Sequence, residues 1–212
     1  MANQNLTRLV FLLDRSGSMQ SIKSDVVGGF DAFVAEQRAG EGECAATLAQ
    51  FDEMYEVVYQ GIPLNEVPSL DLRPRGGTAL LDAMGKLITD TATELNALSD
   101  DANPGTVVVA IMTDGMENSS REWTQPAIKA LVEQQTSAGW EFLYMGADQD
   151  AVEVGRGLGV KAEQAVTYAR GRSREAMMAA SENVRGYRNA KRGDTGAAMP
   201  EFSPEQRSDV SR

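Results

Sequence analysis

The sequence predicts an α/β protein with a doubly wound, mostly parallel sheet, one antiparallel hairpin strand and helices on both faces. Three observations support this fold class. Short apolar runs with the length of buried strands alternate with longer segments of helical periodicity along residues 7–168. Two of the strand-like runs are separated by only two residues, as in a hairpin. The 212 residues suffice for one such domain and a terminal appendage.

The first half of the chain supplies a central strand, a helix and the hairpin. Residues 7–13 are predicted to form a strand that is buried on both faces, because the run is almost wholly apolar. A helix is expected over residues 21–40, with its core face formed by Val26, Phe30, Phe33 and Val34. The paired glycines at 28–29 predict a close approach of this helix to the sheet. Residues 44–51 and 54–59 are predicted to be the hairpin strands.

The second half continues the alternation of strands and helices. Residues 61–77 contain three prolines and are predicted to be an irregular loop that leads into a helix over residues 79–98. Further strands are expected at 106–113 and 140–146, with an edge strand at 164–168. The intervening helices are predicted at residues 123–138 and 150–158.

The composition changes after residue 169, which predicts three parts. Residues 1–169 form the α/β domain, residues 170–192 a C-terminal helix, and residues 193–212 a disordered tail, because that stretch has few apolar residues. Two roles remain open for the C-terminal helix: it packs back on the domain, or it docks on a partner.

Composition excludes several functions. The chain has no histidine, which removes serine and cysteine catalytic sites that depend on histidine and also the usual zinc sites. Cys44 is the only cysteine, so an intrachain disulfide is excluded, and we expect it to be a small apolar side chain. No nucleotide-binding glycine motif follows a predicted strand. The chain is therefore predicted not to be an enzyme.

The distribution of charge and the first residues of the chain bear on its binding partners and its location. Residues 1–169 carry 25 acidic and 11 basic side chains, whereas residues 170–212 carry 6 acidic and 9 basic ones. Such an acidic body disfavours binding to nucleic acid or to anionic membranes. The first residues lack the basic and apolar regions of a signal peptide, and no apolar run is long enough to cross a bilayer. A cytoplasmic location is expected.

Hydroxyl and carboxylate residues follow two predicted strands and precede one predicted helix. They are Asp14, Ser16, Ser18, Thr78 and Asp114. Loops at the carboxyl ends of parallel strands meet at one crevice, so these distant residues are expected to lie together. Three neutral hydroxyls and two carboxylates suit a hard cation with oxygen ligands, such as Mg²⁺.

These segments resemble the von Willebrand factor A (vWA) family, which includes the integrin I-like domains. The family's metal-ion-dependent adhesion site (MIDAS) has the pattern Asp-x-Ser-x-Ser, then Thr, then Asp, and all of its positions are present here in order. The resemblance covers roughly residues 5–168. It implies a complete MIDAS of the intracellular bacterial or phage type, with Mg²⁺, or alternatively Mn²⁺, held by Ser16, Ser18 and Thr78. Asp14 and Asp114 would bind the ion directly or through water.

The resemblance also implies a role in protein binding. Neutral ligands leave the ion with a preference for one more anionic oxygen, which an Asp or Glu carboxylate of a protein partner would supply. The rim that meets this partner is expected to comprise Arg15, Met19, Gly77, Met116, Glu117 and Asn118. The leading prediction is therefore an adaptor, with no nucleic acid or membrane as partner and with an open oligomeric state.

Two other functions are weaker alternatives. The chain could be a structural subunit of a larger assembly, such as a phage particle, in which the metal serves folding alone. A Mg²⁺-dependent hydrolase of the haloacid dehalogenase type would need a second aspartate where Ser16 stands, and a hydroxyl cannot replace that acid–base group near neutral pH.

Overall fold

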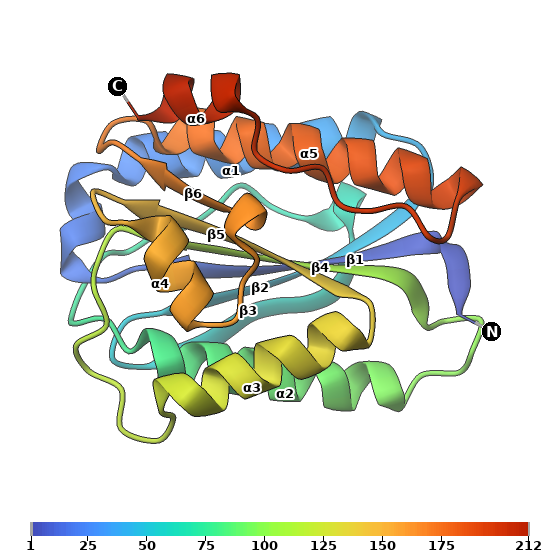
Figure 1. Cartoon of the computed structure of the whole chain (residues 1–212), viewed down its shortest axis with the longest axis horizontal. Coiled ribbons are helices and arrows are strands. Elements are labelled where there is room, and N and C mark those ends of the chain that lie inside the picture. Colours follow the sequence, from blue (N-terminus) through green and yellow to red (C-terminus); the bar gives the residue numbers. More distant parts are fainter. Residues whose placement is uncertain (1, 212) are drawn as a thin grey trace.

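A six-stranded sheet forms the centre of the molecule, as the computed structural model of the chain shows for residues 2–211 (Figure 1). The strand order is β3-β2-β1-β4-β5-β6. Only β2 and β3 are antiparallel; all other neighbours are parallel. The strands are β1 (Asn3–Asp14), β2 (Glu43–Phe51), β3 (Tyr55–Pro63), β4 (Pro104–Thr113), β5 (Trp140–Ala147) and β6 (Ala165–Tyr168). The fold class predicted from the sequence is confirmed.

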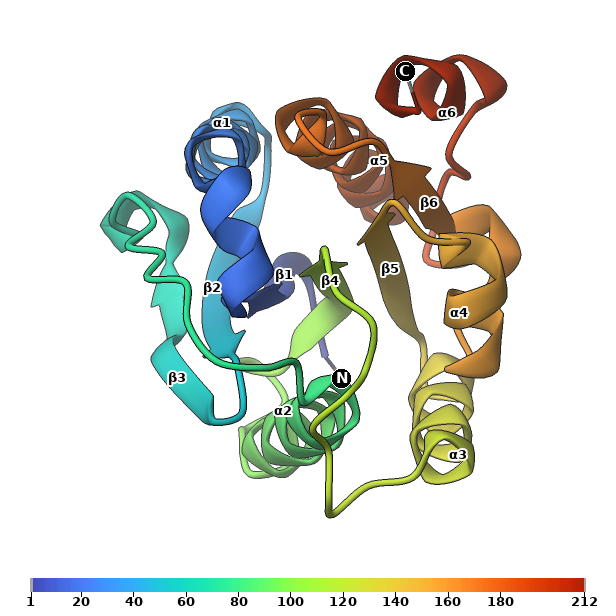
Figure 2. The ribbon, with the colours of Figure 1, turned by 90° about the vertical axis from the view of Figure 1, so that its left-hand side faces the viewer.

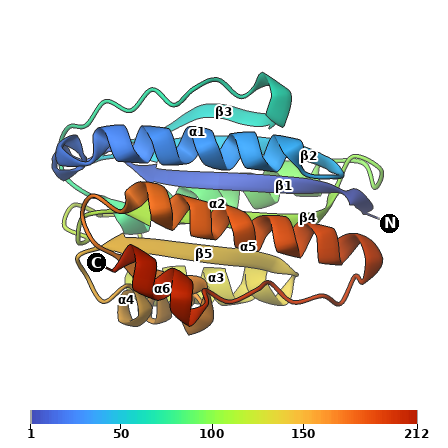
Figure 3. The ribbon, with the colours of Figure 1, turned by 90° about the horizontal axis from the view of Figure 1, so that it is seen from above.

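Helices cover both faces of the sheet (Figures 1 and 3). On one face lie α1 (Lys23–Ala39), α5 (Ser173–Gly193) and α6 (Pro204–Val210). On the other lie α2 (Leu80–Asn96), α3 (Gln125–Ser137) and α4 (Ala151–Gly157). Three short 3-10 helices complete the chain: η1 (Gly17–Ser21), η2 (Leu64–Glu66) and η3 (Ala162–Gln164). Among the described residues, no helix combines the length and apolar character needed to cross a membrane.

The central strands divide their side chains between two cores. On β1, Leu9, Phe11 and Leu13 face the core beneath α1 and α5, whereas Val10 and Leu12 face the core beneath α2 and α3. This alternation follows from the two-residue period of a strand. Phe11 makes edge-to-face contacts with two aromatic rings of α1, which fix the position of that helix above the site-forming end of β1.

The register of the three central strands brings their carboxyl ends to one edge. Asp14, the last residue of β1, is paired with Phe51 of β2, and Leu13 is paired with Met112 of β4. Asp14 therefore lies beside Thr113 and the turn that follows β2. The chain order reverses at β1, which is the switch point where open α/β sheets place their ligands.

The irregular loop begins later than the sequence predicts. Residues 61–63 belong to β3, and the non-helical segment starts only after η2. Pro63 can end this strand because β3 is an edge strand with free space on its outer side. Gly61 has φ of 62° and accepts this conformation without a steric cost, at an irregular part of the β2–β3 pairing.

The C-terminal helix packs on the domain, which decides between its two open roles. Helix α5 runs beside α1 over the sheet (Figure 3), and its Met177, Val184 and Tyr187 are buried in the shared core. The close approach at the paired glycines is to α5, because a Cβ on Gly29 would lie 2.9 Å from the Cα of Arg174. The prediction that these glycines contact the sheet is wrong; only Gly29 is in a close contact, and its neighbour is a helix.

The prediction of a disordered tail from residue 193 is wrong for the described residues. Helix α6 begins with a capping box, in which Ser203 and Gln206 each bond the other's backbone N–H. Three well-spaced apolar side chains, Met199, Phe202 and Val210, are buried in the core beneath α1 and α5. These three side chains anchor a segment of low overall hydrophobicity on the domain.

A substitution tests this ordered tail. Replacing buried Phe202 by alanine should lower the free energy of unfolding by about 3 kcal/mol, because it removes a core ring and leaves a cavity. Urea denaturation measures this value, and Glu201→Ala, at the exposed neighbouring position, serves as the control. Equal stability of the two variants would show that the segment does not pack on the domain.

Candidate metal centre

The carboxyl edge of the sheet carries every residue of the predicted metal site. Figure 2 looks onto this edge, where the loops that follow β1 and β4 and the segment that precedes α2 converge. Asp14 ends β1, Ser16 and Ser18 follow in the turn that becomes η1, and Asp114 follows β4. Thr78 arrives from the long segment before α2.

Asp14 is held on both of its carboxylate oxygens. The backbone N–H of Ser16 donates to Oδ1 over 2.6 Å, and the hydroxyl of Thr113 donates to Oδ2 over 2.6 Å. The side chain is completely buried. These bonds fix its orientation at the end of β1, so it cannot rotate away from the loop residues above it.

A chain of hydroxyls connects the first loop to the third. The Oγ atoms of Ser16 and Ser18 lie 3.1 Å apart, and Ser18 Oγ donates to Asp114 Oδ1 over 2.5 Å. The other oxygen of Asp114, Oδ2, is buried and accepts no hydrogen bond among the described residues. Its nearest charged neighbour is the guanidinium of Arg170, whose Nη2 atom lies 3.4 Å away.

Thr78 lies beside the same point, fixed by the loop after β4. Its N–H donates to Asn118 Oδ1 and its carbonyl accepts from the N–H of Asn118, each over 3.0 Å. A Cβ on Gly115 would come within 2.8 Å of Thr78 Oγ1 and 3.7 Å of Asp14 Oδ2. Glycine at 115 is therefore needed for Thr78 to approach the two aspartates.

Burial destabilises the charged forms of the two site carboxylates. Burial raises the pKa of Asp14 above its usual value, and its bonds from Thr113 and Ser16 oppose this only in part. Burial also raises the pKa of Asp114, against the effects of Ser18 and Arg170. Both shifts have the sign expected for negative charge that is removed from water without a full counter-charge.

These observations fit a hard divalent cation. Ser16, Ser18 and Asp114 form one chain of side-chain contacts, and Asp114 Oδ2 is buried without a hydrogen bond among the described residues. Thr78 Oγ1 and Asp14 Oδ2 lie close by, on either side of the position of a Cβ on Gly115. Within residues 2–211 there is no cluster of three or more histidine, cysteine, aspartate or glutamate side chains that could hold a metal ion, so a cation here would depend on the hydroxyl oxygens. Ser16, Ser18 and Thr78 would hold Mg²⁺ or Mn²⁺ through neutral oxygens, with Asp14 and Asp114 balancing its charge.

Asp52 fastens the loops that carry the site. This buried carboxylate, in the turn between β2 and β3, accepts from Arg15 Nε over 2.9 Å and from Arg75 Nε over 2.7 Å. Its second oxygen accepts from the N–H of Met54, and its carbonyl accepts from the N–H of Ala79, next to Thr78. One side chain thus joins the β1 loop, the hairpin turn and the entry to α2.

Two of the residues expected at the rim are buried instead. Arg15 points down to Asp52 and Glu56 and is only 6% exposed, so its charge is used within the protein. Met19 is fully buried in the core beneath α1. The prediction that these two contact a partner is wrong, because Arg15 is drawn to the carboxylates of the hairpin and η1 turns Met19 into the core.

The remaining rim residues lie around the site. Met116 is 76% exposed and Asn118 is exposed, whereas Gly77 and Glu117 are half-buried. The carboxylate of Glu117 accepts from the N–H groups of Leu81, Ser119 and Ser120. Glu117 therefore acts as a brace at the start of α2, and its charge is offset by backbone dipoles.

Sequence reasoning missed two residues of the site. The hydroxyl of Thr113 donates to Asp14, whereas the sequence marks Thr113 only as the last residue of a predicted strand. Arg170 reaches Asp114 and also Asp148, whose carboxylate it meets at 3.1 Å. The signal for Arg170 was the change from an acidic to a basic segment near residue 170, but no motif linked that change to the site.

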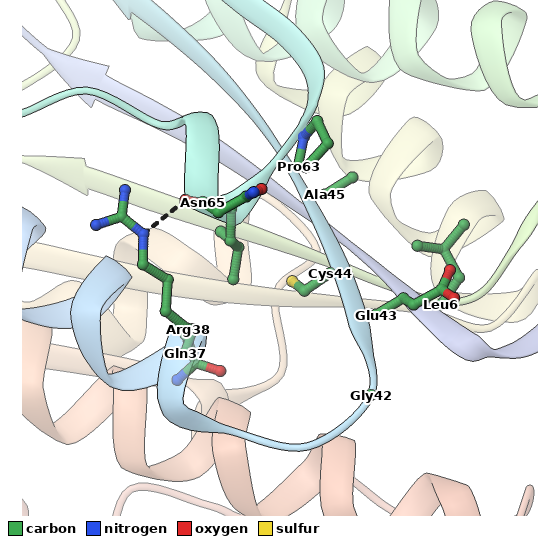
Figure 4. Close-up of a pocket in the computed structure, with 10 residues that line it drawn as sticks. Leu6, Gln37, Arg38, Gly42, Glu43, Cys44, Ala45, Pro63 and Asn65 are labelled. Atoms are coloured by element: carbon green, nitrogen blue, oxygen red, sulfur yellow. Dashed lines mark hydrogen bonds between the residues drawn. The ribbon is translucent and has the colours of Figure 1, made fainter.

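Another cleft lies at the opposite edge of the sheet and lacks comparable chemistry. It has a volume of about 450 Å³ and includes Cys44, Arg38 and Pro63 in its wall (Figure 4). Burial raises the pKa of the Cys44 thiol to about 11, so the reactive thiolate is scarce at neutral pH. The Arg38 guanidinium donates to the carbonyls of η2 and the residue after it. This cleft offers neither a nucleophile nor a free cation.

Comparison with solved structures shows which fold this is. Proximal thread matrix protein 1 from the mussel byssus superposes with a TM-score of 0.60 and 12% identity, over 90% of this chain and 48% of that one. A von Willebrand factor type A protein from Catenulispora acidiphila gives 0.58 and 14%, over 87% and 43%. The vWF domain of the pili tip protein Mfa5 from Porphyromonas gingivalis gives 0.60 and 10%, over 84% and 94%.

The chain therefore has the vWA fold. It spans about half or less of the length of several of these neighbours, but nearly all of the Mfa5 domain. The byssus protein has also been solved with zinc in its MIDAS motif. No protein-family model and no curated protein matches the sequence.

The role of Asp52 can be tested by removing its charge. Asp52→Asn should lower the free energy of unfolding at pH 7 by about 3 kcal/mol, because the buried guanidinium of Arg15 then loses its buried ionic partner and keeps only the exposed Glu56. Bonds from Arg75, Met54 and Arg15 hold the pKa of Asp52 below its usual value, so this contribution is present at neutral pH and disappears as the pH falls through the folded-state pKa.

Urea denaturation between pH 7 and pH 3 measures both effects. The matched control is Asp71→Asn, which breaks an exposed pair with Arg73 and should leave the free energy of unfolding almost unchanged. A similar small loss for both variants would contradict the structural role of Asp52.

Proposed function

We propose that this protein is a Mg²⁺-dependent protein-binding module in which the ion anchors an Asp or Glu carboxylate of a protein partner. The observation that carries this proposal is the convergence of Ser16, Ser18, Thr78 and two aspartates at one surface point, where Asp114 Oδ2 has no hydrogen-bond donor. A bound Mg²⁺ would supply a coordination position that prefers one further anionic oxygen.

Different residues around the site have different roles in this proposal. Asp14 is immobilised by two short hydrogen bonds, so it provides a fixed negative charge beneath the site. Ser18 is exposed and belongs to the outer side of the site, where a partner would arrive. The loops cannot separate easily, because Asp52 ties two of them to the hairpin turn. Such a preorganised site lowers the entropic cost of binding an ion and a partner.

Arg170 favours an acidic partner over a basic one. The body of the chain is strongly acidic, which would repel a carboxylate at long range. Arg170 brings a half-exposed positive charge to the edge of the site, next to Asp114. Its guanidinium offsets part of the negative charge of Asp114 and Asp148, and so lowers the repulsion that an incoming carboxylate meets at the site.

The general class of function has support from the fold. Neighbours with this fold include a pili tip protein and a byssus matrix protein with a metal-loaded MIDAS, so a protein-interaction module is the coarse role that the likeness favours. The choice of Mg²⁺, an adaptor role, the absence of enzymatic activity, a cytoplasmic location and a bacterial or phage origin are parts of this proposal. A structural subunit with a structural metal is the alternative that the experiments below separate from it.

Metal binding should stabilise the folded protein. Free Mg²⁺ at a hundred times its dissociation constant should add about 2.7 kcal/mol to the free energy of unfolding, because the assembled site exists only in the native state. Thr78→Val removes one ligand oxygen at nearly constant volume and should abolish most of this gain. Thr93→Val, at an exposed threonine of α2, should retain it.

Urea denaturation with Mg²⁺ or with EDTA provides the measurement. Equal stability of the wild-type protein in the two solutions, at Mg²⁺ concentrations up to the millimolar range, would contradict a Mg²⁺ site. The same experiment with Mn²⁺ tests the other candidate ion.

The binding role requires a partner that depends on the ion. We expect the wild-type protein to retain at least one protein from its host lysate in Mg²⁺ but not in EDTA. The double variant Ser16→Ala/Thr78→Val should lose that protein, and the control Ser137→Ala/Thr93→Val should keep it. Replacing the partner's acidic residues one at a time by the corresponding amides should then identify a single essential carboxylate.

Retention that is equal in Mg²⁺ and EDTA, and equal for both double variants, would contradict the proposal. Combined with metal-dependent stability, that result would favour the structural alternative, in which the ion serves folding alone.

A further inference from the structure

A small apolar pocket opens next to the metal site. It lies between the start of α2, the loop after β4 and helix α4. These elements meet at the edge of the sheet that faces the viewer in Figure 2. Its volume is about 180 Å³, and apolar side chains make up most of its wall, among them Leu80, Leu81, Val154 and Leu158. An apolar cavity of about 150 Å³ accommodates a benzene ring, so this pocket has room for one aromatic side chain.

The pocket and the metal site share a wall. Gly115 lines the pocket, and it is also the residue on which a Cβ would touch Thr78 Oγ1. Leu80 and Met116 line the pocket as well, and each lies two residues after a predicted ligand, Thr78 and Asp114 respectively. The pocket therefore adjoins the predicted metal site.

Two polar side chains of the pocket wall contact each other. Tyr144 is completely buried, and its hydroxyl interacts with the side chain of Gln149. These groups partner one another, so the rest of the wall offers mainly apolar surface.

Met116 makes the mouth of the pocket adaptable. It is 76% exposed, which is unusual for a methionine beside an apolar cavity. Its flexible thioether can fold over an aromatic ring and contact it favourably.

We propose that this pocket receives an aromatic side chain of the same partner whose carboxylate binds the metal, two residues away from that carboxylate. The inference rests on the proposed function and specifies the partner further. In an extended segment, side chains two residues apart point to the same face and are separated by roughly 7 Å, two steps of about 3.4 Å. In this arrangement the carboxylate would lie at the ion and the ring in the pocket beyond Gly115.

Short peptides of defined sequence test this arrangement in the full chain. The probe Ac-Tyr-Ala-Asp-Ala-Tyr-NH₂ carries an aromatic residue two positions from the carboxylate on either side, so it allows both chain directions. Ac-Ala-Ala-Asp-Ala-Ala-NH₂ lacks the rings, and Ac-Tyr-Ala-Asn-Ala-Tyr-NH₂ lacks the charge. Titrations of the methyl-labelled protein, in Mg²⁺ and in EDTA, give the dissociation constants and show whether the methyl signals of Leu80, Leu81 and Val154 move.

In Mg²⁺, the tyrosine–aspartate peptide should bind at least about tenfold more tightly than the alanine–aspartate peptide, since filling an apolar pocket discriminates on that scale. Val154→Phe fills the pocket and should erase this preference, while the affinity for the alanine–aspartate peptide stays within about twofold. Val152→Phe is the matched control, because Val152 is a half-buried residue of the same helix that does not line the pocket.

The outcomes separate the two proposals. Equal Mg²⁺-dependent affinity for both aspartate peptides would overturn the aromatic pocket and leave the carboxylate site intact. Binding of the tyrosine peptides that is indifferent to Mg²⁺ and to the Asp-to-Asn change would show an apolar pocket uncoupled from the ion, and would also overturn the inference. If no aspartate peptide shows Mg²⁺-dependent binding at millimolar concentration, the proposed function fails together with it.

Discussion

The parallel pairing of β1 with β2 on one side and β4 on the other is the constraint on which the site depends. Because these strands are in register, Asp14, the turn after Phe51 and Thr113 all end at the same height. Every residue near the site is then positioned over a short distance from one of these strand ends. Arg170 instead follows β6, and the other exception is Thr78, which reaches the edge through a long non-helical segment.

That exception explains the density of contacts around Asp52. A segment without regular hydrogen bonding would not hold Thr78 in place by itself, and the chain supplies the missing restraint through one buried carboxylate and the backbone of Asn118. The hydroxyls near the ion position are thus set by a second layer of ionic and backbone contacts, which is how ligands are usually oriented in metal sites.

The sequence predicted the elements well because both of its signals are local. A doubly buried strand such as residues 7–13 is visible as an apolar run, and the MIDAS pattern specifies residue types at short spacing. The fold class followed from the order of these elements. What failed depended on contacts between distant segments: Arg15 turns inward to a carboxylate 37 residues away, and Arg170 reaches a residue 56 positions earlier. The prediction of a disordered tail failed for the same reason, since Phe202 is isolated in sequence and contacts other apolar residues only in the folded molecule.

The position of the last helix has a consequence for the order in which the molecule assembles. The N–H of Ala169 bonds the carbonyl of Val210 over 2.8 Å, so α6 supports the residue immediately before Arg170. The contacts between the first and third loops already join residues 96 and 99 positions apart. Contacts of such separation form slowly, because a long loop must close before they contribute. During synthesis, a chain that has not yet extended to Val210 holds the ligand residues without the support behind Arg170. The hydrogen bond between Ala169 and Val210 can therefore form only after all residues of the predicted metal site have been synthesised.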